Sequence, residues 1–532
     1  MLTKQEQAHL RDGLFRHLDG IVTAPTAWSL VENGAIDYIL KKGKIELEEM
    51  AAELKANTGY LNVALHVLCS QGWLNQLDPN AATVQYEIND QSAKAFNLFH
   101  HYRKSAELLK YGEKFHPRKF EAQPFSVLEE VYADLKELRK AASENSLEFQ
   151  VMKHIEGIVV GPTAVHLGMS GMFHKYFMEA RFKSEEFHED PKNFGRLLDI
   201  LTDLGWFNKE NETYQFTDKG LFYAKRASAY GVTVSYIPIL RRLDDLIFGD
   251  ANKLRDLKEG QDEQHVDRAM NVWGSGGAHA TYFKVVDKVI IDIFNQPLHK
   301  QPKGILDMGC GNGAFLIHLF DVIDNQTLRG EHLDEHPLTI VGVDYNKAAL
   351  RISKANIIQA DIWAKVIWGD IGKPELLADD LKNNYGIELS DLLNVRTFLD
   401  HNRVWDPPQS SNQQNGTSSG AFAHRGVRIS NTDVEASLLE HARKWSPHVS
   451  KHGLLIIELH TVKPEIAARN IGKTAATAYD ATHGYSDQYI LEIEQFNRMM
   501  EEAGLNSDPN VFRKFPNTDY ATVSINLFKG GS

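Results

Sequence analysis

The first half of the chain alternates between stretches with apolar residues at helical spacing and short segments that alternate like strands. Leu65 and Leu68 lie three positions apart, Gly72 and Trp73 follow them, and the segment VQYEIND comes next. A glycine directly after such a periodic run is typical of a helix C-terminus. Alternation of apolar and polar residues is typical of a strand. We therefore predict a helix followed by a β-wing.

This helix and wing occur twice. The segment HLDGIVTAPTAWSLVENG, which begins at His17, aligns with HIEGIVVGPTAVHLGMSG, which begins at His154. Downstream, ALHVLCSQGWLNQ aligns with LLDILTDLGWFNK at nearly the same offset. We therefore predict two copies of one winged-helix-like unit. His17 and His154 each lie beside apolar residues in a helical stretch, which favours packed or capping histidines over ligands.

From residue 304 the pattern changes to apolar strands separated by amphipathic helices, which is typical of a parallel sheet in an α/β fold. We predict a first strand from Gly304 and further strands in TIVGVDYN and KVIWGDIGKP. A fourth strand and its exit are predicted in ELSDLLNVRTFLDHNRVW, and a fifth strand in KHGLLIIELHTV. The predicted fold class is therefore α/β: a Rossmann-like sheet, preceded by a mostly α region with two winged-helix-like repeats. We place the first repeat in residues 1–115, a helical connector in 116–150, the second repeat in 151–260 and the sheet in 261–532.

Composition and charge exclude several classes of protein. Of the 532 residues 42% are apolar and 24% are charged, which is ordinary for a folded globular chain and excludes a disordered one. The 58 Lys and Arg stand against 71 Asp and Glu, so the net charge of −13 disfavours nucleic acid as a partner. We find no apolar run of roughly 18 residues, the length of a membrane span. With only Cys69 and Cys310 there is no disulfide framework, and we expect a cytoplasmic protein.

A glycine-rich turn follows the first predicted strand of the sheet. In GILDMGCGNGAFLIHLF, Asp307 ends the strand and Gly309, Gly311 and Gly313 precede an amphipathic helix. Glycines let the backbone turn sharply and approach a ligand, and the helix that follows presents unpaired N–H groups. The dinucleotide fingerprint needs G-x-G-x-x-G, whereas this spacing is G-x-G-x-G.

The turn and the acids at the following strand ends resemble those of class I S-adenosylmethionine methyltransferases. The resemblance implies that the Asp307 to Gly313 turn binds S-adenosylmethionine. It also implies that Asp344, after TIVGV, accepts the ribose hydroxyls, and that Asp370, after KVIWG, contacts the adenine amine. Each acid taken alone would be read as an N-cap or loop residue. Three acids at three successive strand ends favour the cofactor site. In many O-methyltransferases a winged helix before the catalytic domain mediates dimerisation and helps cover the substrate.

Polar residues also follow the last two predicted strands. Asp400 and His401 follow LLNVRTFL, and Glu458 and His460 lie at the end of GLLIIELH. Open α/β sheets bind ligands at the carboxyl ends of their strands, so these residues should face one crevice. They suit either a general base or, with further donors, an ion such as Fe(II) or Mn(II). Beyond them we predict a polar loop that holds Tyr479, Asp480, His483, Asp487 and Gln488.

The segments VRTFLDHNR, TSSGAFAHRG, LLIIELHTV and GKTAATAYDATHGYSDQY resemble the mononuclear-iron-dependent C-methyltransferases of apratoxin-type polyketide starter modules. That family also carries a winged-helix-like lid before its catalytic domain, so the likeness covers nearly the whole chain. It implies methylation of the α-carbon of a malonyl-type thioester on an acyl carrier protein, with a divalent metal, Fe or Mn, as Lewis acid. Arg396, Arg403 and Arg425 are candidates to hold a carboxylate or the phosphopantetheine phosphate.

Under this hypothesis the metal ligands are His401 and Gln488, with His483 as a further ligand. His460 and His483 are alternatives as ligand or base, and Asp400 and Glu458 orient imidazoles. The alternative is a metal-independent O- or N-methyltransferase of a small molecule, with the paired winged helices as a homodimer interface and His401 or His460 as the base. A third hypothesis is a winged-helix protein that senses S-adenosylmethionine without catalysis.

Overall fold

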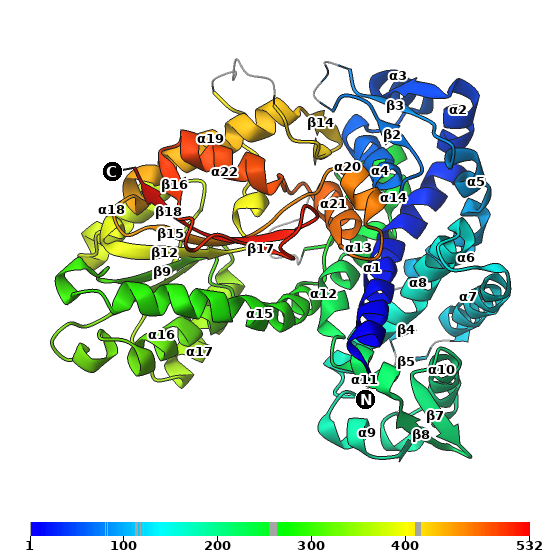
Figure 1. The fold of residues 1–532 in the computed structure, drawn as a ribbon, viewed down its shortest axis with the longest axis horizontal. Helices are drawn as coiled ribbons and strands as arrows, with labels where there is room; N and C mark the ends of the chain where they lie inside the picture. The colour runs from blue at the N-terminus through cyan, green and yellow to red at the C-terminus, as the bar shows by residue number, and fades with distance from the viewer. Residues whose placement is uncertain are drawn as a thin grey trace. The chain divides into compact units, whose positions relative to one another are not determined.

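The computed structural model describes residues 2–79, 81, 83–111, 115–116, 119–120, 122–254, 263–409 and 416–531. The chain divides into two compact units (Figure 1). Unit 1 comprises residues 1–279, 421–429 and 463–487, and unit 2 comprises 280–420, 430–462 and 488–532. Two segments from the second half of the sequence are therefore part of the unit formed by the N-terminal half.

The first repeat in unit 1 is a long helix followed by shorter helices and a three-stranded antiparallel sheet of order β1-β3-β2. Its elements are α1 (Lys4–Glu32), α2 (Ala35–Lys42), β1 (Lys44–Glu46), α3 (Leu47–Leu54), α4 (Thr58–Ser70), β2 (Asn75–Gln76) and β3 (Gln85–Glu87). The helix and wing predicted from the sequence correspond to α4, β2 and β3. After them come α5 (Ser92–Asn97), α6 (Tyr102–Lys110), β4 (Phe115–His116), β5 (Lys119–Phe120) and α7 (Ala122–Ala141).

The second repeat has the same plan, with a sheet of order β6-β8-β7. Its elements are α8 (Leu147–Met169), α9 (Lys175–Glu179), β6 (Phe182–Lys183), α10 (Pro191–Asp203), β7 (Phe207–Glu210) and β8 (Thr213–Phe216). Helices α11 (Asp218–Ala224), α12 (Ser228–Ser235), α13 (Ile237–Leu240), α14 (Leu243–Phe248) and α15 (Arg268–Phe294) follow. The equal strand orders confirm the duplication of the wing.

The two repeats meet where α1 crosses α8, at a reciprocal pair of glycines. A Cβ atom at Gly20 would lie 2.2 Å from the Cα of His154, and one at Gly157 would lie 2.4 Å from the carbonyl oxygen of His17. Both distances are far shorter than a carbon atom tolerates, so only glycine permits this approach of the two backbones.

His17 and His154 are packed in the core, as predicted, and they also bond reciprocally. The His17 Nδ1 lies 2.8 Å from the hydroxyl of Tyr230 in the second repeat, and the His154 Nδ1 lies 2.8 Å from the hydroxyl of Tyr102 in the first. Burial lowers the pKa of both histidines, that of His154 to about 3. Both rings are therefore neutral at physiological pH and join the repeats by uncharged hydrogen bonds.

Unit 2 is built on an eight-stranded sheet of order β11-β10-β9-β12-β15-β18-β16, with β17 paired to β18. Strands β9 to β12 and β15 are parallel, and β18 is antiparallel to its neighbours. The strands are β9 (Gly304–Met308), β10 (Thr339–Asp344), β11 (Lys365–Trp368), β12 (Leu392–Thr397), β15 (Leu454–Leu459), β16 (Leu505–Ser507), β17 (Arg513–Phe515) and β18 (Val523–Gly530). The predicted Rossmann-like sheet is confirmed.

Helices connect successive strands of this sheet. They are α16 (Ala314–Gln326), α17 (Lys347–Gln359), α18 (Pro374–Tyr385), α19 (Asn431–Val449) and α22 (Ile493–Glu502). None of the helices within the described ranges has a stretch long and apolar enough to cross a membrane.

The loop predicted around Tyr479 and His483 is instead the buried helix α21 (Ala476–Tyr485), which belongs to unit 1. Alanines favour the helix, and unit 1 supplies partners for its polar side chains. The Asp480 Oδ2 lies 3.2 Å from the His66 Nε2, and Gln71 donates to the Thr477 hydroxyl at 3.0 Å. Unit 1 also contains α20 (Pro464–Arg469) and the hairpin of β13 (Phe422–His424) and β14 (Val427–Ile429).

We expect Gly157→Ala to destabilise unit 1, because its methyl group would overlap the backbone of α1 at His17. Overpacking of this kind costs about 1–3 kcal/mol, so thermal unfolding should begin several degrees lower. The control is Gly276→Ala in α15, where an added Cβ meets no atom within 4 Å and alanine should be neutral or stabilising. Equal melting temperatures for the two variants would contradict the close crossing of α1 and α8.

Asp19 should make the stability depend on pH. Burial, opposed by a hydrogen bond from Gln71 and by Arg16 but reinforced by Asp480, raises the pKa of Asp19 from 3.8 to about 7. The unfolded chain releases this proton near pH 4 and the native chain keeps it until about pH 7. Stability should therefore fall as the pH rises between these values and level off above them, by at most about 4 kcal/mol.

Asp19→Asn removes this titration, so its melting temperature relative to the wild type should increase from pH 4 to pH 7. Differential scanning calorimetry across this range measures the effect. A constant offset between the two proteins at every pH would show that Asp19 does not titrate in this window.

Candidate functional site

The glycine turn of unit 2 has the conformation that its sequence predicts. Gly309, Gly311 and Gly313 connect β9 to α16 with φ values of +80°, +55° and +79°. These left-handed conformations favour glycine. A Cβ at Gly311 would meet no atom within 4 Å, so this part of the turn borders open space, whereas one at Gly313 would lie 2.7 Å from the Ser353 hydroxyl. The turn thus combines an open side for a ligand with close packing at the start of α16.

Asp344, at the end of β10, is bonded to this turn. One carboxylate oxygen accepts the N–H of Gly311 at 3.0 Å, and the other accepts the N–H of Asn346 at 2.8 Å. The carboxylate is only partly buried, so it remains accessible to a ligand lying on the turn. The structure therefore brings the predicted ribose acceptor and the predicted cofactor-binding turn together.

Asp307, at the end of β9, is a buried carboxyl group. Burial raises its pKa well above the ordinary value, and the negative charge of Asp344 raises it further. A cationic ligand nearby would stabilise the ionised form of Asp307 and so lower the pKa that burial and Asp344 raise. S-adenosylmethionine carries a sulfonium and an ammonium group, so the buried acid, the open turn and Asp344 fit this cofactor.

Asp370 follows β11, as predicted, but it also shapes its own turn. Its Oδ1 accepts the N–H of Gly372 at 2.9 Å, and the Lys373 ammonium lies 3.6 Å from its Oδ2. The predicted contact with adenine is compatible with this arrangement and stays a prediction.

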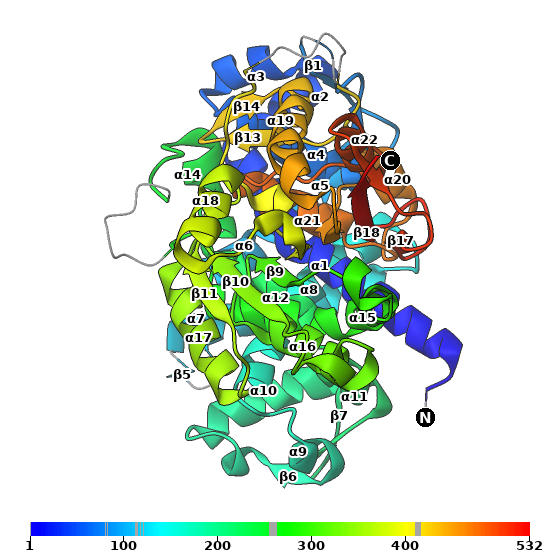
Figure 2. The same cartoon turned by 90° about the vertical axis from the view of Figure 1, so that its left-hand side faces the viewer.

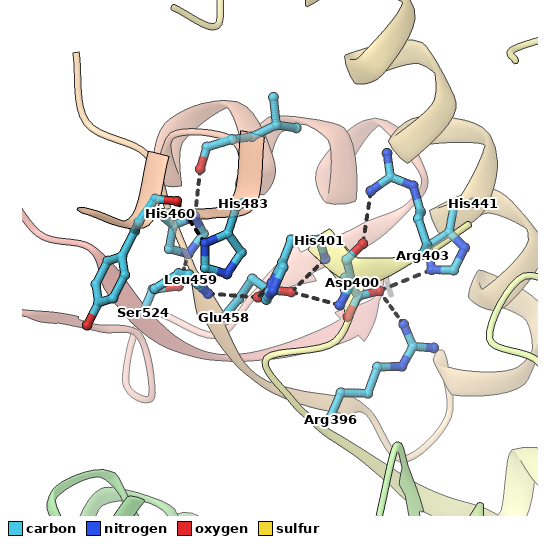
Figure 3. Close-up of polar contacts among 12 residues, drawn as sticks. Arg396, Asp400, His401, Arg403, His441, Glu458, Leu459, His460, His483 and Ser524 are labelled. Carbon is cyan, nitrogen blue, oxygen red and sulfur yellow. Dashed lines mark hydrogen bonds and ion pairs between the residues drawn. The ribbon is translucent and has the colours of Figure 1, made fainter. Parts of the chain in front are cut away.

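Glu458, at the end of β15, is the centre of a buried cluster with the exit of β12 (Figure 3). Its Oε1 lies 2.5 Å from the His401 Nδ1, and its Oε2 accepts the N–H of Asp400 at 2.9 Å. Its Oε1 also accepts the N–H of Leu459 at 2.7 Å. A carboxylate at this distance favours the tautomer in which the His401 Nδ1 donates to Glu458 and the Nε2 faces away from it. The same arrangement orients histidines that bind metals or act as bases.

Asp400 is held from the opposite side. The Arg396 Nη1 lies 2.6 Å and the His441 Nε2 lies 3.1 Å from the Asp400 Oδ1, and Arg403 donates to the Asp400 carbonyl at 2.9 Å. Burial favours the neutral acid, but Arg396 and His441 outweigh burial and lower the pKa of Asp400. Asp400 is thus a fixed carboxylate that supports the turn bearing His401.

This cluster corrects one sequence-based interpretation. Arg396 is fully buried and paired with Asp400, and Arg403 is buried and bonded to backbone oxygens, so neither is displayed to bind a substrate anion. Sequence reasoning also missed His441, which lies in the middle of α19. No local pattern distinguishes this histidine from other residues of an amphipathic helix.

His460 has two hydrogen-bond partners within unit 2. Its Nδ1 lies 3.0 Å from the Leu491 carbonyl, and its Nε2 lies 2.8 Å from the Ser524 hydroxyl. Burial lowers its pKa to about 4. Two partners and a lowered pKa are typical of a structural histidine, so the geometry favours His401 over His460 for chemistry.

The predicted metal ligands do not all belong to the same unit. His401 and Gln488 are buried in unit 2, whereas His483 belongs to unit 1, where its Nδ1 lies 2.8 Å from the Tyr479 carbonyl. Among the residues that the structure describes, no group of three or more His, Cys, Asp or Glu is arranged to hold a metal. The ligand set therefore stays a prediction.

The exit of β12 touches the cofactor turn. A Cβ at Gly309 would lie 3.0 Å from the side chain of Leu399, two residues before His401. Strand β12 also pairs with β9 on one side and with β15 on the other. The glycine turn and the His401 turn are therefore neighbours at the carboxyl edge of one parallel sheet, where open α/β sheets bind ligands.

Three family models match consecutive parts of the chain. They are the AprA N-terminal domain at residues 10–76, the AprA winged helix domain at residues 156–250 and the AprA MT2-like domain at residues 263–526. No curated protein matches the sequence. The matches fall in the first repeat, the second repeat and the sheet, and the methyltransferase-domain match supports an enzyme over a sensor without catalysis.

Solved structures with a similar fold are remote in sequence. A protein from Nostoc punctiforme assigned as an O-methyltransferase is 14% identical, over 73% of this chain and 100% of that chain, with a TM-score of 0.43. An O-methyltransferase family protein from Burkholderia thailandensis is 13% identical, over 69% and 94%, with a TM-score of 0.38. The DszA carbon methyltransferase is 12% identical, over 78% and 98%, with a TM-score of 0.35. Likenesses at this level carry no conclusion about substrate or reaction.

We expect Asp344→Ala to weaken binding of S-adenosylhomocysteine at least 10-fold, measured by isothermal titration calorimetry. The variant removes the predicted ribose acceptor and the bond to Gly311, and a hydrogen bond to a charged group contributes about 1.5–3 kcal/mol. Asp361→Asn, an exposed position in unit 2 whose positive φ asparagine accepts, is the control and should bind like the wild type. Unchanged affinity in Asp344→Ala would remove Asp344 from the cofactor site.

Proposed function

We propose that this chain, which belongs to the AprA-like S-adenosylmethionine-dependent methyltransferases, methylates the α-carbon of a malonyl-type or related acyl thioester in polyketide or other natural-product biosynthesis. The observation that carries the proposal is His401, oriented by Glu458 beside the cofactor turn. The substrate would be presented by an acyl carrier protein or arrive as a free small molecule.

S-adenosylmethionine, when bound, supplies the electrophilic methyl group. The chain's own part is to hold this group at the turn of Gly309 to Gly313 and to place His401 at the neighbouring strand end. The α-hydrogen of a thioester is weakly acidic, so the reaction needs both removal of a proton and stabilisation of the enolate oxygen. Buried side chains in fixed positions can remove the proton and stabilise the enolate oxygen more effectively than solvent water, which must reorient.

We assign His401 to stabilisation of the enolate, through a divalent metal that it would hold together with Gln488. Fe or Mn at these residues would supply Lewis-acid chemistry. Glu458 fits such a site because metal-binding histidines almost always donate their second N–H to a carboxylate or a carbonyl. His483 remains the sequence-based candidate for a further ligand or for the base.

The same dyad supports a second candidate function, O- or N-methylation of a small molecule without a metal. A histidine whose Nδ1 faces a buried glutamate is also a good general base, because the carboxylate stabilises the protonated ring. In this function the His401 Nε2 would take the proton from a hydroxyl or amine of the substrate. The two functions differ in their metal requirement and in the atom that receives the methyl group.

The deciding experiment combines metal analysis with product analysis. Protein purified without chelator or nickel would be assayed with malonyl-loaded carrier protein and ¹³C-methyl-labelled S-adenosylmethionine, before and after chelation. We expect about one Fe or Mn per chain, activity lost on chelation and restored by metal, and a ¹³C shift of a methyl group on carbon. Chelator-resistant transfer to oxygen or nitrogen would overturn the proposal in favour of the second function.

His401→Ala should lower kcat/KM at least 100-fold while S-adenosylhomocysteine still binds within about twofold of the wild type. Glu458→Gln, which keeps the shape but removes the charge that faces His401, should lower it roughly 10- to 100-fold. His299→Ala, an exposed histidine of unit 2, is the matched control. Full activity in His401→Ala would exclude His401 from both functions.

A further inference from the structure

Exposed apolar side chains are concentrated at one edge of unit 2. Of the 15 large hydrophobic residues that are exposed in the described part of the chain, seven lie between residues 345 and 385. Trp363 is 95% exposed and Ile358 is 65% exposed. The seven are Tyr345, Ile352, Ile358, Trp363, Trp368, Leu376 and Tyr385. A clustered apolar surface of this kind marks an interaction site, whereas single exposed apolar residues do not.

This surface surrounds the end of the sheet. Within the described residues, β11 is the terminal strand and pairs with β10 only, and Figure 2 shows α17 and α18 next to it. A cavity of about 470 Å³ opens beside β11, lined among others by Trp368, Leu376 and Tyr385. Asp370, Lys373 and Asp380 line the same cavity, so its wall is partly charged. An edge strand with unpaired backbone groups is a site at which another chain can add.

The two helices at this edge carry opposite charges. On α17, Lys347, Arg351 and Lys354 are exposed at a spacing of four and three residues, which places them on one side of the helix. On α18, Glu375 and Asp379 are exposed at a spacing of four. None of these five forms an ion pair in the part of the chain that the structure describes.

We propose that this edge, formed by α17, β11 and α18, binds a second copy of the chain, with α17 of each copy facing α18 of the other. In a twofold dimer the same patch serves both partners, so it must be complementary to itself. A patch that combines exposed apolar side chains with cations on one helix and acids on the other meets this condition. A uniformly acidic partner, such as a carrier protein, would be attracted by α17 and repelled by α18.

Sedimentation equilibrium over a range of concentrations tests the proposal. The wild type should form a dimer whose dissociation constant rises with ionic strength, because exposed charge pairs are screened by salt. Trp363→Ser should weaken the dimer about 10-fold or more, since an exposed tryptophan between the two elements of this edge, α17 and β11, is a typical anchor. A wild type that stays monomeric at high concentration and low salt would overturn the proposal and leave the edge to a different partner.

Charge-reversal variants test whether α17 of one copy contacts α18 of the other, rather than a dimer formed through a different surface. Variant A carries Lys347→Glu, Arg351→Glu and Lys354→Glu, and variant B carries Glu375→Lys and Asp379→Lys. Each should be monomeric alone, with a dissociation constant raised about 100-fold, because like charges then face each other. Mixed together, A and B should form a heterodimer, since the acidic α17 of A meets the basic α18 of B.

The matched control reverses three exposed cations of unit 1, Lys94, Lys192 and Lys225, and should dimerise like the wild type. Circular dichroism verifies that every variant is folded. Dimerisation of variant A or B alone, or failure of folded A and B to associate, would show that α17 and α18 do not face each other.

Discussion

One buried carboxylate, that of Glu458, determines how the candidate site is built. Its oxygens accept the N–H of Asp400 and of Leu459 and face the His401 Nδ1, so it joins the ends of β12 and β15. Glu458 is only 1% exposed, and burying a charged carboxylate without hydrogen-bond donors would cost folding free energy. The turn after β12 must therefore keep its shape for the fold to tolerate the charge, and the same shape fixes the position of the imidazole.

The support of this turn extends into the layer of helices that covers the sheet. Asp400 is held by Arg396 from β12 and by His441 from α19, and the Arg396 guanidinium lies 4.0 Å from the centre of the Trp445 ring. Removing Arg396 would leave the buried charge of Asp400 without its cationic partner. A helix without any residue in the predicted site thus takes part in orienting His401.

In unit 1 the two repeats share one hydrophobic core. The glycine crossing of α1 and α8 and the two His–Tyr bonds are reciprocal, so each repeat completes the core of the other. The two repeats differ at the acidic residue two positions after the histidine, which is Asp19 in the first repeat and Glu156 in the second. Glu156 reaches to 3.4 Å from His17 and also pairs with Lys153, whereas the shorter Asp19 has one oxygen without a partner among the described residues. Burial thus raises the pKa of Asp19, whereas Lys153 and His17 lower the pKa of Glu156 in spite of its burial.

The sequence by itself determined the parts of this protein whose pattern is local. The two wings, the glycine turn and the acids of β9, β10 and β11 are each specified within a few residues, by strand alternation and by the need for glycine at positive φ. Only the tertiary structure decided the rest. His401 and Glu458 lie 57 residues apart. The segment around Asp480, whose polar residues suggested a loop, is a buried helix whose polar side chains bond to His66 and Gln71 of unit 1. A hydrogen bond between residues far apart in the sequence produces no repeating pattern in that sequence. The tertiary structure is therefore needed to identify which polar residues contact each other.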